Sequence, residues 1–115
     1  VPNNNYPPYN IRKIDEENWS VDVALAGFSK DDISVEHKPD ENSLIIKSQI
    51  DKDEKEVEDN EGILYRGISK RQFTRSFSIA DDVIVKGAKL ENGLLSVELQ
   101  KIIPEEKKPK TIEIR

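Results

Sequence analysis

The chain has 115 residues, a formal net charge of −5, 36% charged residues and a mean hydropathy of −0.71. This length fits one domain with a core of its own, and the excess of 23 acidic over 18 basic residues argues against a nucleic-acid partner. The absence of cysteine and the single histidine exclude disulfides and thiolate metal sites, so we expect no metal and no cofactor.

The sequence contains no stretch that predicts membrane insertion or export. A spanning helix needs roughly 18 apolar residues or more, and no segment approaches this length. The N-terminus also lacks the basic and then apolar layout of a signal peptide. We therefore expect no membrane partner, and the absence of cysteine is typical of the reducing cytoplasm.

The first third of the chain predicts an irregular arm followed by two strands. Residues 1–9 are rich in proline and asparagine, and proline lacks the N–H that a ladder needs, so we expect a flexible arm there. Residues 10–14 are weakly patterned, whereas residues 19–25 alternate strictly and predict a strand. The apolar face of this strand consists of Trp19, Val21, Val23 and Leu25.

Two alternating segments, residues 33–37 and 44–48, predict an antiparallel pair joined by a turn at residues 39–42. Residues 51–61 follow with seven acids and two lysines, a composition that is typical of a solvated loop or of one exposed helical turn. The short apolar segment after this loop is isolated, so it needs a sheet edge to pair with, and an edge on another molecule would serve. Its residues are Ile63, Leu64 and Tyr65.

Residues 72–79 predict a strand whose core face consists of Phe73, Phe77 and Ile79. Arg75 lies on the same face and cannot be buried without a partner. We therefore expect it either to pair with a carboxylate or to lie at a subunit boundary.

The last third predicts a β-hairpin. Two short runs, residues 83–85 and 88–90, precede Asn92-Gly93 and the alternating residues 94–99. Asn-Gly favours a type I′ turn, because both residues accept positive φ angles. The inner face of the final strand consists of Leu95, Val97 and Leu99. With at least seven short strands and no amphipathic helix, residues 10–101 predict an all-β antiparallel sandwich.

The C-terminal extension, residues 102–115, carries an isolated apolar pair. Ile112 and Ile114 alternate with polar residues, and Pro104 and Pro109 separate them from the preceding strands. So short a strand cannot build a core, and it must pair either with the chain's own sheet edge or with another subunit.

No set of residues predicts catalysis. The glycines at positions 62 and 67 have the spacing of a phosphate loop, but Ile68 stands where the lysine should be. His37 has no serine or cysteine near it in sequence, and the acids crowd into one exposed run. We expect no enzyme and no catalytic residue, and a function that depends on contacts with other chains.

Three separated motifs resemble those of the small heat-shock proteins. Residues 88–95, AKLENGLL, resemble the A-x-x-x-x-G-[VIL]-L signature of the alpha-crystallin domain. Residues 73–77 resemble the F-x-R-x-F strand, and residues 112–114 the Ile-x-Ile tail motif. The segments YPPYNI at residues 6–11 and AGF at residues 26–28 are similar to the bacterial inclusion-body-binding branch. Compared with that family we expect the N-terminal arm to be absent or shortened, with residues 1–9 as its remnant.

This resemblance implies an immunoglobulin-like sandwich with flexible arms and an ATP-independent holdase chaperone that binds partly unfolded client proteins. It implies strand-swapped dimers that form larger homo-oligomers and pass clients to ATP-dependent chaperones. The swapped strand would be residues 63–65 within the loop 51–67, with Arg75 at the dimer boundary. The tail motif would dock in a groove of a neighbouring subunit lined by Ile33, Val35, His37, Val83 and Val85. The alternative is a monomeric co-chaperone or adaptor module with the same sandwich.

Overall fold

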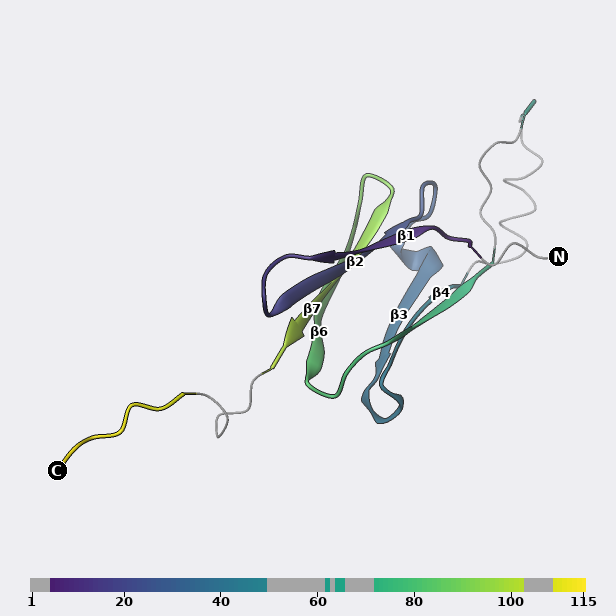
Figure 1. Ribbon diagram of the computed structural model, residues 1–115. Helices are drawn as coiled ribbons and strands as arrows, with labels where there is room; N and C mark the ends of the chain where they lie inside the picture. Colours follow the sequence, from purple (N-terminus) through teal and green to yellow (C-terminus); the bar gives the residue numbers. More distant parts are fainter. Residues whose placement is uncertain (1–4, 50–61, 63, 66–71, 103–108) are drawn as a thin grey trace.

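The computed structural model shows an antiparallel β-sandwich (Figure 1). It describes residues 5–49, 62, 64–65, 72–102 and 109–115. A sheet with strand order β1-β2-β7-β6 packs on a sheet with order β3-β4-β5. Over the described residues, the strands are β1 (Tyr9–Lys13), β2 (Asn18–Ala24), β3 (Ile33–Lys38), β4 (Ser43–Ser48), β5 (Thr74–Ser78), β6 (Val83–Glu91) and β7 (Leu94–Lys101), with short 3-10 helices η1 (Lys30–Asp32) and η2 (Pro39–Glu41). The predicted all-β antiparallel sandwich is confirmed.

The core lies between the inner faces of the two sheets. Strand residues alternate between two faces, so every second residue of a central strand points inward. The central strands β2, β4 and β7 supply most of the apolar residues that are 2% exposed or less, which are Val21, Val23, Leu44, Ile46 and Val97. Leu25, directly after β2, is 1% exposed. The inner faces predicted for β2 and β7 are therefore confirmed, with Trp19 half-buried at the border of the core.

The hairpin predicted at Asn92-Gly93 is present. Asn92 has φ 54° and Gly93 has φ 77°, so both residues take the positive angles that a type I′ turn requires. The two runs predicted before the turn belong to one strand, β6, and its register shifts between Val85 and Gly87. A bulge of this kind interrupts the alternation along the sequence without ending the strand.

The chain enters the sandwich through residues that pack on the core. The Tyr6 ring meets the Phe73 ring edge-on at 6.0 Å, and Pro7 is fully buried. The backbone N–H of Ala24 donates to the Pro8 carbonyl at 3.0 Å. Residues 6–8, predicted as part of the arm, thus lie against the sandwich, and β1 begins directly after them.

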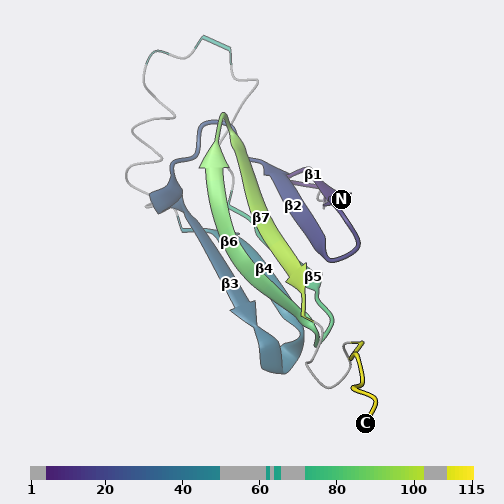
Figure 2. The ribbon, with the colours of Figure 1, turned by 90° about the vertical axis from the view of Figure 1, so that its left-hand side faces the viewer.

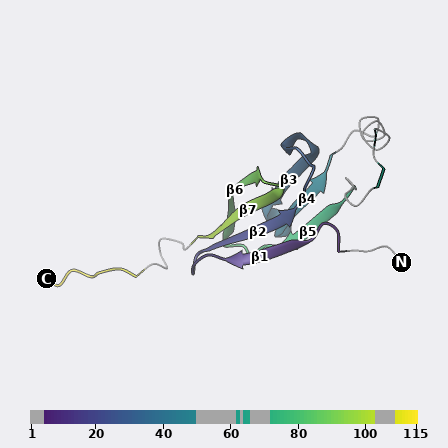
Figure 3. The ribbon, with the colours of Figure 1, turned by 90° about the horizontal axis from the view of Figure 1, so that it is seen from above.

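Each sheet ends in two edge strands, and these edges lie on opposite sides of the sandwich. Figure 2 shows β3 beside β6, and Figure 3 shows β1 beside β5. The C-terminal residues 109–115 lie away from both sheets (Figure 1), with Ile112 82% and Ile114 94% exposed. Edge strands carry backbone groups that are free to pair with another chain, so the fold leaves four candidate surfaces for contacts.

Candidate functional site

A groove lies between the edge strands β3 and β6. Its cavity volume is about 340 Å³. We call it the β3–β6 groove, and the residues that line it are Lys30, Ile33, Val35, Ala88, Leu90 and Leu95.

The apolar character of the groove follows from strand alternation. Ile33 and Val35 are two residues apart on β3, so both point toward the opposite sheet. On the other wall, Leu90 of β6 pairs with Leu95 of β7 in the hairpin ladder. Ala88 has the smallest of the apolar side chains that line the groove, which leaves room between the two walls.

The five predicted groove residues divide into two groups. Ile33 and Val35 line the groove, whereas His37, Val83 and Val85 are half-buried and do not line it. Figure 2 shows β3 and β6 running in opposite directions, so the start of β3 faces the end of β6. The residues that the sequence analysis missed are Lys30, Ala88, Leu90 and Leu95. Ala88 could have been predicted as a groove residue from the sequence, because it is the first residue of the alpha-crystallin signature.

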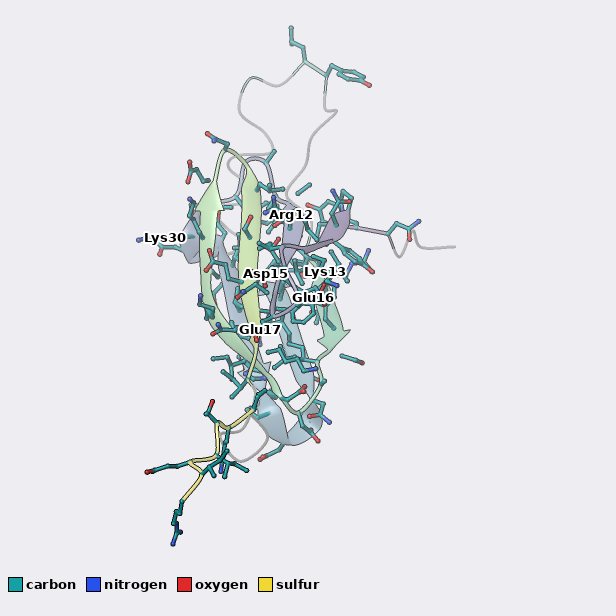
Figure 4. The ribbon with its side chains drawn as sticks, turned by 60° about the vertical axis from the view of Figure 1, so that its left-hand side comes forward. Arg12, Lys13, Asp15, Glu16, Glu17 and Lys30 are labelled. Atoms are coloured by element: carbon teal, nitrogen blue, oxygen red, sulfur yellow. The ribbon has the colours of Figure 1, made fainter. Side chains whose placement is uncertain are left out.

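Lys30 is the charged residue among those that line the groove. It is exposed at the start of η1 and forms no ion pair with any residue that the structure describes. Figure 4 shows its side chain projecting at the edge of the sandwich, apart from the labelled residues of the β1–β2 turn. Lys89 of β6, by contrast, pairs with Glu91 at 2.8 Å, and this hydrogen bond raises the pKa of Lys89 and lowers that of Glu91.

On the opposite side of the sandwich, one cationic and two aromatic side chains connect β1 to β5. Tyr9 meets Phe77 edge-on, with ring centroids 5.0 Å apart, and the Arg75 Cζ lies 5.1 Å from the Tyr9 centroid. Arg75 shares the inner face with Phe77, as predicted, but its buried Nε has no hydrogen-bond partner among the described residues. Beside this cluster, Ile11 of β1 is 61% exposed.

The turn between β1 and β2 carries a dense set of charges (Figure 4). The Asp15 carboxylate accepts hydrogen bonds from the Glu17 backbone N–H and the Asn18 amide, each at 2.8 Å. The Glu17 N–H is the larger cause that lowers the pKa of Asp15. Lys13 pairs with Glu16 at 3.3 Å. These contacts close the turn.

The segment predicted to swap between subunits is described only in part. Leu64 and Tyr65 are almost fully exposed and belong to no strand. Ile63 and the acidic residues 51–61 lie outside the described residues. Across the described part of the chain, no group of three or more His, Cys, Asp or Glu side chains could hold a metal ion. Nor does that part contain a helix long and apolar enough to cross a membrane.

Comparison with known proteins identifies the family. Residues 11–115 match the Hsp20/alpha crystallin family. The chain belongs to this family. This small heat-shock protein is 46% identical over 111 residues to the small heat shock protein HspH of Bradyrhizobium diazoefficiens. The aligned region covers 96% of this chain and 68% of HspH. It is 39% identical over 112 residues to the small heat shock protein IbpA of Escherichia coli, an alignment that covers 97% of this chain and 77% of IbpA.

A solved small heat shock protein from Synechococcus phage S-ShM2 has the same fold. Its TM-score is 0.65 at 38% identity, over 95% of this chain and 99% of that chain. The predicted alpha-crystallin domain and its likeness to the inclusion-body-binding branch are thereby confirmed. Its relatives give this small heat-shock protein a chaperone role and not that of an enzyme.

Proposed function

We propose that this small heat-shock protein is an ATP-independent holdase of the cytoplasm. It binds partly unfolded client proteins, prevents their aggregation and holds them until ATP-dependent chaperones act. The observation that carries the proposal is that one chain has two separate apolar surfaces, the tail isoleucines and the β3–β6 groove, which are not in contact with each other. Ile112 and Ile114 are exposed at 82% and 94%, while the β3–β6 groove stands open. Both surfaces are suited to bind other chains.

In the proposed assembly, the tail of one subunit fills the β3–β6 groove of a neighbour. The groove volume of about 340 Å³ is more than twice that of a cavity of roughly 150 Å³ that accepts benzene, so two isoleucine side chains fit. Burying both isoleucines contributes roughly 3–6 kcal/mol. Association costs about 4–15 kcal/mol, so one tail alone binds weakly.

Dimers make this weak contact effective. Two tails on one dimer raise each other's effective concentration, so an oligomer can be stable and still exchange subunits. A tail that leaves its groove exposes apolar surface on both partners. That exposure supplies a binding surface for a client when heat shifts the equilibrium.

The dimer is proposed to form by strand exchange at β1. The outer edge of β1 is unpaired within the described chain, and an extended segment can add to such an edge through backbone hydrogen bonds. The donor would be residues 63–65 of a second copy. The buried Arg75 Nε without a partner supports a place for Arg75 at this boundary, where an acceptor from the second copy would satisfy it.

Light scattering on the full chain and on a version ending at Lys110 tests this proposal, with aggregation of a heat-sensitive client followed in parallel. The double variant Ile112→Ala/Ile114→Ala should behave as the truncation, and Thr111→Ala is the matched control. We expect the full chain to exceed a dimer and the truncated chain to stop at a dimer. Equal sizes would place the tail on its own sheet, and a monomer without client protection would favour an adaptor module.

A further inference from the structure

We propose that Lys30 of one subunit and Glu113 of another form an ion pair that fixes the register of the tail in the β3–β6 groove. This inference rests on the proposed docking of the tail in a neighbouring subunit. It adds a charge contact that favours one register, beyond the apolar contacts of the two isoleucines.

The tail's alternation separates its apolar and charged side chains. In an extended segment, successive side chains point to opposite sides. When Ile112 and Ile114 enter the groove, Glu113 therefore points back toward its mouth. Thr111 and Arg115 lie on the same outer side as Glu113.

Lys30 is placed to meet a carboxylate at the mouth of the groove. It lines the groove, is exposed, and has no ion-pair partner among the described residues. Two acids follow it in η1: the Asp32 carboxylate accepts the Ser29 backbone N–H at 3.0 Å, and Asp31 forms no ion pair with any described residue. Lys89 of β6, by contrast, already pairs with Glu91 at 2.8 Å. Lys30 is therefore the cation of the groove lining that can meet Glu113.

The same charges disfavour a shifted tail. A slip by two residues keeps one isoleucine in the groove, but it replaces Glu113 by Thr111 or Arg115 on the outer side. Thr111 offers no charge, and Arg115 would face Lys30 with the same sign. Recognition of this kind combines attraction in the correct register with repulsion in a wrong one.

The experiment is a charge swap in the full chain. Lys30→Glu, Glu113→Lys and the double variant Lys30→Glu/Glu113→Lys are compared by dilution in light scattering, at low and high salt. Each single variant should dissociate at a concentration about threefold higher or more, as expected for a solvent-exposed pair. The double variant should return toward the original value, and high salt should remove the differences. Lys38→Glu, an exposed lysine of β3 outside the groove, is the matched control.

Two outcomes overturn the proposal in distinguishable ways. If Ile112→Ala/Ile114→Ala dissociates the oligomer while the single charge variants assemble as the original chain, the tail docks and the ion pair is absent. Single variants that weaken assembly without recovery in the double variant also exclude the pair. If the isoleucine variant assembles normally, the docking itself is wrong.

Discussion

The guanidinium of Arg75 lies over the ring of Tyr9, with Cζ 5.1 Å from the ring centroid, and so connects edge strand β5 of one sheet to edge strand β1 of the other. The other pair of edges, β3 and β6, has an apolar groove between them. The sandwich is therefore bridged by a cation and an aromatic ring on one side and open to an apolar ligand on the other.

Arg75→Met should weaken the dimer more than the fold. Methionine keeps an apolar stem but removes the cation, whose contact with an aromatic ring contributes about 0.5–1 kcal/mol at an exposed site. In the chain ending at Lys110, sedimentation should show a raised dimer dissociation constant, with a change in unfolding free energy of about 1 kcal/mol or less. Lys47→Met, on the outer face of the same sheet, is the control. An unchanged dimer would remove Arg75 from the boundary.

Ala88→Arg should block the β3–β6 groove. The small alanine leaves the space between the two walls, and an arginine would occupy it with a long charged side chain. Light scattering should show the same reduction in size as removal of the tail. Ala80→Arg adds the same charge at an exposed position between β5 and β6, and it should leave the oligomer intact. Full-size oligomers in both variants would contradict docking in this groove.

Leu44→Ala should strongly destabilise the sandwich. Leu44 is fully buried in the central strand β4, and a cavity at such a site costs about 2–5 kcal/mol. Urea denaturation measures the loss. Ile84→Ala removes a similar aliphatic side chain at a position that is 42% exposed, and it should cost clearly less. Equal losses in the two variants would contradict the assignment of the core.

Gly93→Ala and Gly87→Ala should change the unfolding free energy by different amounts or in opposite directions. Gly93 has φ +77°, and an added Cβ would lie 3.3 Å from the Ala26 Cα, so we expect a loss of about 1–3 kcal/mol in unfolding free energy. An added Cβ at Gly87 would meet no atom within 4 Å, and its φ is not positive. Alanine there should be nearly neutral or stabilising, because it restricts the unfolded chain. Thermal unfolding of both variants makes the comparison.

The Asp15 carboxylate should show a lowered pKa in an NMR titration, because the Glu17 N–H and the Asn18 amide donate to its charged form. A depressed pKa means that the contribution to stability is present above the unfolded value and is lost as pH falls through the folded value. Asp15→Ala should therefore reduce the loss of stability on acidification. A pKa at or above the ordinary value would contradict the turn geometry.

The strands and their inner faces could be read from the sequence because alternation is a local property. Val21 and Val97 occupy the core positions that their alternation predicted. The Asn92-Gly93 turn was likewise predictable, since its backbone angles depend on those two residues. The bulge in β6 was not, because alternation that stops and resumes looks the same in one bulged strand as in two short ones.

The β3–β6 groove could likewise be predicted from the sequence only in part. The sequence by itself determined that β3 and β6 carry apolar faces, that the tail ends in an isolated apolar pair, and that the chain belongs among the small heat-shock proteins. Only the tertiary structure decided that Ile33 lines the same groove as Leu90 and Ala88, and that Lys30 lines it with them. The physical reason is that strand pattern is set by neighbours along the chain, whereas the meeting of two edges depends on how twisted sheets cross, which no local pattern records.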